Sequence, residues 1–176
     1  MASPPLNVVY FAHGRESGPW GIKIKRLARI ALSRGFAVES PDYRGIDDPQ
    51  ARVERLLALK PAALDKLVLA GSSMGGYVAA AASQTLDPGG LFLMAPAVLL
   101  PGFGRQDIRP RAGVMMAIHG WNDDVIPPEN ALRFCRAHNI PLHLLTCGHA
   151  LIEALTMVDA LFALFLDEVV RSAQRP

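Results

Sequence analysis

The pentapeptide Gly71-Ser72-Ser73-Met74-Gly75 decides the interpretation of this chain of 176 residues. It fits the pattern Gly-x-Ser-x-Gly of a nucleophile elbow, a sharp turn between a strand and a helix that exposes a serine hydroxyl. An apolar run at 66–70 precedes it, and an alanine-rich run at 76–84 follows it. Ser73 is therefore the candidate nucleophile. The alternative is a plain turn between a strand and a helix.

Apolar segments alternate with helical patterns on both sides of this motif. We expect strands at 7–12, 36–39, 66–70, 91–95, 114–118 and 142–146, and helices at 20–34, 49–59, 76–84, 127–138 and 150–171. Short, continuously apolar strands separated by helices indicate a parallel sheet that is covered on both faces. The sequence thus predicts one domain over residues 1–176, an α/β doubly wound sandwich with about six parallel strands.

Composition narrows the possible partners and environment. The net charge of +2 is too small to argue for nucleic acid. The most apolar segment, 150–166, is interrupted by charged and polar residues, so we expect no membrane span. The segment 1–7 lacks the pattern of a secretory signal, and we expect a cytoplasmic protein in which Cys135 and Cys147 are free thiols.

Polar residues follow three of the predicted strands, at the sheet edge where ligands of such folds bind. Ser73 follows the third strand, Asp123 the fifth and His149 the sixth. A serine hydroxyl needs a histidine to take its proton, and a carboxylate holds the imidazole in the right tautomer. We assign Ser73 as nucleophile, His149 as general base and acid, and Asp123 as the orienting acid. Asp124 is the rival acid, and either aspartate could instead cap the following helix.

Acyl transfer also needs an oxyanion hole made of backbone N–H groups. We expect one N–H from Met74, the residue after the nucleophile. The other should come from the loop after the first strand, from Arg15 or, as second choice, Glu16. The glycine-rich segment 14–21 matches neither phosphate-binding pattern, Gly-x-x-x-x-Gly-Lys-Ser/Thr or Gly-x-Gly-x-x-Gly, so we expect no cofactor there.

The other histidines have simpler interpretations. His138 lies in a helical pattern and is expected at the surface, whereas His143 lies in a strand, in the core or at the edge. His119 is expected to bond to nearby backbone. A zinc site from His143, Cys147 and His149 would lack a fourth ligand at a recognised spacing, so no metal is expected.

Five short motifs, taken in their order along the chain, resemble the serine-hydrolase branch of the α/β-hydrolase superfamily. Within this branch, the chain resembles the small bacterial esterases and thioesterases with little or no cap. The motifs are His13-Gly14, Pro41-Asp42-Tyr43-Arg44-Gly45, the elbow with Gly76, His119-Gly120 with Asp123 and Pro127, and Gly148-His149. The resemblance implies a hydrolase sheet, the triad Ser73, Asp123 and His149, no cofactor, and a small ester or thioester as substrate. A non-catalytic binding protein on this fold and a peptidase with the same triad remain the alternatives.

This sequence departs from larger members in two ways. The two antiparallel strands that usually begin the fold are missing, and the usual cap position holds only 98–111, which implies a shallow, open site. Arg105, Arg109 and Arg111 in that segment are either solvated charges or an attraction for an anionic acyl carrier or a carboxylate substrate. The apolar segment 161–166 is either core or the face of a homodimer.

Overall fold

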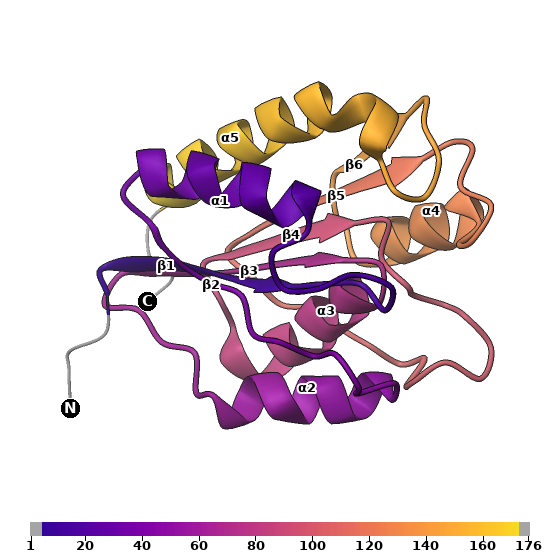
Figure 1. The fold of residues 1–176 in the computed structure, drawn as a ribbon, viewed down its shortest axis with the longest axis horizontal. Coiled ribbons are helices and arrows are strands. Elements are labelled where there is room, and N and C mark those ends of the chain that lie inside the picture. Colours follow the sequence, from indigo (N-terminus) through magenta and orange to yellow (C-terminus); the bar gives the residue numbers. More distant parts are fainter. Residues whose placement is uncertain (1–4, 173–176) are drawn as a thin grey trace.

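The computed structural model describes residues 5–172 and contains a six-stranded sheet in the order β2-β1-β3-β4-β5-β6 (Figure 1). Residues 1–4, part of the segment tested above for a secretory signal, lie outside the described residues. The strands are β1 (Asn7–Ala12), β2 (Ala37–Glu39), β3 (Lys66–Ser72), β4 (Gly90–Met94), β5 (Val114–Gly120) and β6 (Leu142–Leu145). All neighbouring strands pair in parallel. The predicted parallel α/β architecture is confirmed.

Helices cover both faces of the sheet. On one face α1 (Ile22–Ser33) packs beside α5 (Leu155–Arg171), and the opposite face carries α2 (Pro49–Ala58), α3 (Met74–Leu86) and α4 (Pro128–Ala137) (Figure 1). The N-terminus of α2 is capped, because the Asp48 side chain accepts a hydrogen bond from the Ala51 N–H, and Pro49 takes the first helical position. Each face has its own hydrophobic core.

The core beneath α1 and α5 contains a cluster of aromatic rings. Phe92 lies 4.9 Å from Phe162 and 5.2 Å from Phe165 between ring centroids, and Phe11 also contacts Phe162. In the segment 161–166, four residues are buried: Leu161, Phe162, Phe165 and Leu166. This segment therefore belongs to the core, as the first of the two interpretations predicted.

The last helix starts later than its apolar pattern suggested. A 3-10 turn, Ile152–Ala154, precedes α5, and Leu151 before it has a left-handed backbone with φ of 59°. The Leu151 side chain is buried, so the chain turns here to place it in the core before the helix begins. Among residues 5–172, no helix is long and apolar enough to cross a membrane.

The strand order creates a crevice at the carboxyl edge of the sheet. From β1 the chain leaves toward β2 on one side, and β3 lies on the other side of β1. The segments after β1 and β3 therefore diverge at this topological switch point, where α/β proteins bind ligands. Ser73 and Gly14 follow these two strands.

Candidate active site

Ser73 occupies a strained turn between β3 and α3. Its φ of 56° and ψ of −121° lie in a region that residues with a side chain rarely adopt. The flanking glycines make the turn possible: a Cβ on Gly71 would lie 2.0 Å from the carbonyl oxygen of Gly75, and a Cβ on Gly75 would lie 1.9 Å from that of Ala12. The close packing of α3 on the strands thus requires glycine at both positions.

The structure brings together the three predicted site residues, which come from three different strand ends. His149 Nε2 lies 3.0 Å from Ser73 Oγ, and His149 Nδ1 lies 2.8 Å from Asp123 Oδ2. An Nδ1–H that donates to the carboxylate leaves Nε2 free to accept the serine proton, which assigns this tautomer to the neutral imidazole. The Asp123 side chain is fully buried, whereas Ser73 and His149 are partly exposed on the pocket side.

The Asp123 carboxylate is held by four groups. Oδ1 accepts the backbone N–H groups of Val125, at 2.9 Å, and Ile126, at 2.8 Å. Oδ2 contacts both His149 and Nε2 of the buried His119, the latter at 3.0 Å. The expected backbone bond of His119 is confirmed, since Nε2 also lies 2.9 Å from the Ile126 carbonyl oxygen. Its contact with Asp123 was not foreseen from the sequence.

The rival acid Asp124 is exposed and makes no contact with His149 among the described residues. The N-cap of α4 is Pro127, without a side-chain hydrogen bond, so the proposed capping by Asp123 or Asp124 does not occur. Asp123 instead organises the turn that leads toward this helix.

Two candidate oxyanion donors line the same pocket as Ser73. Met74 is the first residue of α3, so its N–H has no acceptor within the helix. Arg15 follows Gly14, and a Cβ on Gly14 would lie 3.5 Å from the Cβ of Ser73, which shows how close this loop comes. Among residues 5–172, the N–H of Arg15 has no hydrogen-bond partner.

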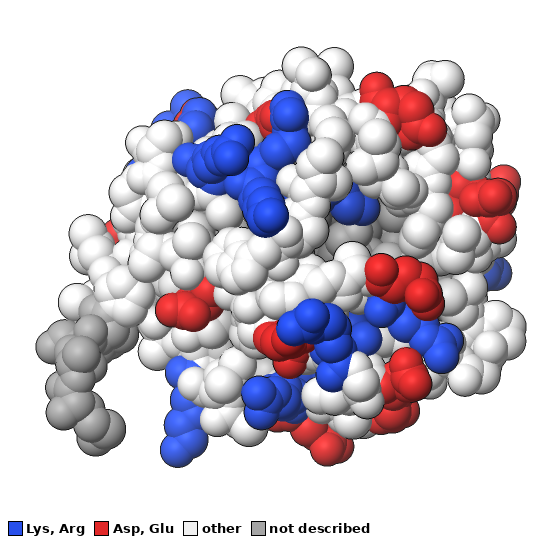
Figure 2. Space-filling model, viewed as in Figure 1, with Lys and Arg blue, Asp and Glu red and all other residues white. Residues whose placement is uncertain are grey.

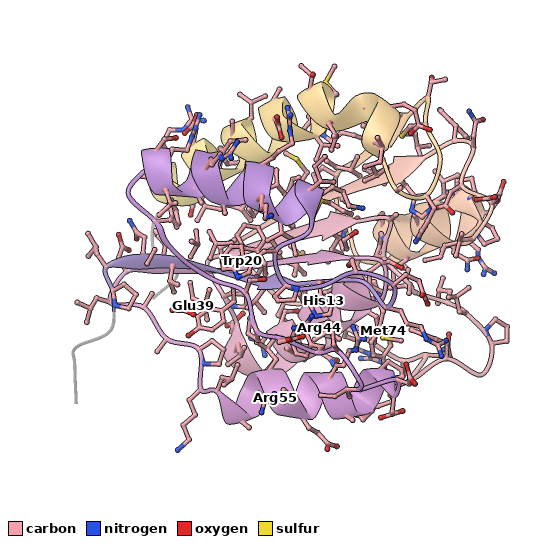
Figure 3. All side chains as sticks on the ribbon, viewed as in Figure 1. His13, Trp20, Glu39, Arg44, Arg55 and Met74 are labelled. Carbon is pink, nitrogen blue, oxygen red and sulfur yellow. The ribbon has the colours of Figure 1, made fainter. Side chains whose placement is uncertain are left out.

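The loop after β1 is anchored by buried polar side chains. His13 bonds through Nδ1 to the Gly14 carbonyl oxygen at 2.7 Å and accepts the Tyr43 N–H on Nε2 at 2.9 Å. The buried Arg52 guanidinium donates to the carbonyl oxygens of His13, at 3.2 Å, and Gly14, at 3.3 Å. Burial lowers the pKa of His13, which favours the neutral ring that this bonding requires. Figure 3 labels His13, which follows β1, and Met74, which begins α3 after the neighbouring strand β3.

A pocket of about 450 Å³ opens over Ser73 and His149, within the size range of small-molecule sites. The short connection between β4 and β5 supplies Leu100 and Phe103 to its wall, and the pocket stays open to solvent. Lys23, in the first turn of α1, also lines the pocket. Desolvation lowers the pKa of its ammonium from 10.5 to about 8, although the charges of Asp123 and Cys147 act to raise it.

Sequence patterns did not reveal Lys23 or Arg52. In the sequence, Lys23 is one of several lysines and arginines in the helical pattern at 20–34, and Arg52 is one of several charged residues in the pattern at 49–59. Only the fold distinguishes them, since Lys23 lies partly buried in the pocket wall and Arg52 is 1% exposed. No local signal in the sequence could have shown this, because it depends on which loop crosses over the helix.

The remaining candidates lie away from the pocket. Arg105, Arg109 and Arg111 are exposed and do not line it, and Arg105 and Arg111 pair with Asp107 and Asp87. Acidic and basic side chains are intermixed on the face seen in Figure 2.

Both cysteines are free and buried, and burial raises the pKa of the Cys135 thiol to about 12. Within residues 5–172 there is no group of three or more His, Cys, Asp or Glu arranged to hold a metal ion. His143 is half-buried in the edge strand β6, and the partly exposed His138 ends α4 and contacts the Phe134 ring.

Comparisons with known proteins agree with this architecture. The sequence profile of the alpha/beta hydrolase family matches residues 9–174. A protein of Xanthomonas campestris pv. campestris, described as a hydrolase of the alpha/beta superfamily, is 31% identical with a TM-score of 0.83, over 92% of this chain and 99% of that one. No curated protein sequence is significantly similar to this chain.

More distant structures show the fold alone. Est1E from Butyrivibrio proteoclasticus has a TM-score of 0.80 at 16% identity, over 96% of this chain and 90% of that one. A serine hydrolase without a lid from Xanthomonas campestris has a TM-score of 0.64 at 20% identity, over 99% of this chain and 88% of that one.

Proposed function

Since this chain belongs to the alpha/beta hydrolase family, we propose that it is a serine hydrolase that cleaves carboxylic esters or thioesters through an acyl-enzyme on Ser73. The observation that carries the proposal is the continuous chain of contacts from Ser73 Oγ through His149 to Asp123, at 3.0 and 2.8 Å. These distances are those of a nucleophile, its base and the acid that orients the base.

In the first half-reaction, Ser73 Oγ attacks the carbonyl carbon of the substrate while His149 Nε2 takes the hydroxyl proton. Asp123 stabilises the imidazolium that forms. Its carboxylate is held in position by hydrogen bonds from two amides and by its contact with His119. His149 then gives the proton to the leaving alcohol or thiol as the carbon–oxygen or carbon–sulfur bond breaks.

The tetrahedral intermediate carries its negative charge on the former carbonyl oxygen. We assign the N–H groups of Met74 and Arg15 to this oxygen, because both residues line the pocket beside Ser73 and both groups lack other acceptors. The buried Arg52 and His13 hold the Gly14 segment in place, so the second donor is positioned before substrate arrives.

In the second half-reaction, His149 takes a proton from water, whose oxygen attacks the acyl carbon. The bond between this carbon and Ser73 Oγ then breaks, His149 returns the proton to Oγ, and the acid is released. The pocket accommodates a small molecule, and Leu100, Phe103, Val125 and Ile126 give it apolar walls suited to an acyl chain or an aromatic group. An ester or thioester of modest size therefore fits the site.

A fluorophosphonate probe tests the proposal, because it reacts with a serine that a neighbouring base activates. We expect one covalent adduct on the peptide that contains Ser73, by mass spectrometry, together with hydrolysis of p-nitrophenyl butyrate. Both should disappear in Ser73→Ala and persist in Ser33→Ala, which removes an exposed hydroxyl from α1. An adduct elsewhere, or none in folded protein, would contradict the proposed function.

A further inference from the structure

Lys23 is a cation that lines the pocket without a partner of its own. It lies in the first turn of α1 and shares the pocket with Ser73 and His149. Within residues 5–172, its ammonium makes no hydrogen bond or ion pair. Arg15, the other cation of the lining, differs because its guanidinium is exposed and pairs with Asp47 at 3.4 Å.

Other cations of the α1 region that face α5 are neutralised. Arg26 pairs with Asp159 and Arg34 pairs with Asp167, both on α5. Asp123 is the nearby anion that acts on Lys23, but its two oxygens already contact two amides and two histidines. Asp123 therefore acts on Lys23 only through space, and the ammonium keeps its hydrogen-bond donors for another anion.

Three local preferences oppose a lysine at this place. A cation in the first turn of a helix opposes the helix dipole. Partial burial among apolar groups costs hydration, which shows in the pKa of about 8 for this ammonium. Flexible lysines normally leave such surroundings by extending into water. Residues that violate several local rules at once are expected at functional positions.

We propose that Lys23 binds an anionic group, a carboxylate or a phosphate, that the substrate carries in addition to the reacting ester. The inference rests on the serine-hydrolase function proposed above and defines its substrate class as anionic esters or thioesters. The charged ammonium would donate hydrogen bonds to the anion inside a partly desolvated pocket, where such bonds are strongest. Arg105, Arg109 and Arg111, considered from sequence for this role, lie outside the pocket lining.

Two pairs of esters distinguish the two places at which a substrate can carry the anion. The acyl pair is p-nitrophenyl hemiglutarate against p-nitrophenyl valerate, and the leaving-group pair is 3-butyryloxybenzoate against 3-butyryloxybenzamide. For each pair we measure the ratio of kcat/KM, anionic over neutral, after subtracting spontaneous hydrolysis. If replacement of Lys23 changes the ratio for one pair, Lys23 contacts the anion on that side of the substrate.

We expect Lys23→Met to lower the ratio by about 10- to 100-fold in at least one pair, the effect of losing one charge-assisted hydrogen bond. Lys25→Met is the matched control, because it makes the same substitution at an exposed position of the same helix. It should leave both ratios at the wild-type value. Equal ratios in wild type and Lys23→Met for both pairs would overturn the proposal.

Binding of glutarate and of inorganic phosphate, followed by isothermal titration calorimetry, makes the inference testable without turnover. Wild type and Lys25→Met should bind at least one of these anions, and Lys23→Met should bind it at least tenfold more weakly. Anion binding that depends on Lys23, without ester cleavage or fluorophosphonate labelling, would reject the proposed function and keep the anion site. Ester cleavage with no effect of Lys23 in either assay would reject the anion site and keep the hydrolase.

Discussion

Replacement of Lys23 by methionine should stabilise the free protein, and the gain should shrink as the pH rises. The folded-state pKa of Lys23 is about 8, against 10.5 for an ordinary lysine, so the unfolded chain binds more protons between these values. Wild-type stability therefore rises with pH through this window, because deprotonation relieves the desolvated charge. Methionine removes the charge at every pH and keeps a side chain of similar length.

The size of the effect follows from the same two pKa values. The difference of about 2.5 corresponds to about 3 kcal/mol when Lys23 is fully charged in both states. At pH 6.5 the variant should therefore be more stable than wild type by about 3 kcal/mol, and at pH 9.5 by roughly half as much. Both proteins keep the other charged and titratable groups in and near the pocket, Arg15, Glu16, Asp123, Cys147 and His149, so the difference between the proteins reports the Lys23 charge together with its interactions with Asp123 and Cys147.

Urea unfolding of wild type, Lys23→Met and Lys25→Met at several pH values between 6.5 and 9.5 measures these differences. Lys25 is exposed, so its variant should follow the wild-type profile within about 0.5 kcal/mol. A Lys23→Met protein that is less stable than wild type at pH 6.5 would refute the reasoning. So would a stability gain of the same size at both ends of the range, since that would come from packing and not from charge.

Two further substitutions test the elbow and the acid. Gly75→Ala places a Cβ 1.9 Å from the Ala12 carbonyl oxygen and should destabilise the fold by at least about 3 kcal/mol in urea unfolding. Gly18→Ala is its control, because the nearest atom would be 3.8 Å away, and equal stability of the two variants would contradict the packing argument. His119→Phe removes one contact from Asp123 and should lower kcat about tenfold with KM unchanged, because His119 lies outside the pocket lining. An unchanged kcat for p-nitrophenyl butyrate would show that His119 does not position this acid.

The sequence predicted most of the sheet and the placement of Ser73, Asp123 and His149 together at its edge, because these features depend on short patterns. The elbow is encoded within five residues, and its glycines are required by contacts of the turn itself. Asp123 and His149 could be chosen because each follows an apolar run that becomes β5 or β6.

The features that could not be predicted from the sequence depend on contacts between distant segments. Lys23 cannot be told from the other cations of α1 in the sequence, yet in the structure residues 14–17 and the His149 segment line a pocket together with it. The position of Asp123 against His149 depends on the turn at Val125 and Ile126, whose amides bind its carboxylate and not that of Asp124. The start of α5 shifted because burial of Leu151 outweighed the helical pattern that begins at Ala150.

The connection between β4 and β5 has a consequence for how such a protein can diversify. It contributes Leu100 and Phe103 to the pocket wall but takes no part in strand pairing, which resumes at Gly90 opposite Val114 whatever lies between. The two ends of the segment belong to the core, through Val98, Ile108 and Ala112, whereas 105–107 are exposed. An insertion at this exposed stretch would change the chain next to the pocket wall and leave the buried ends in place, so variation in substrate range is expected to concentrate there.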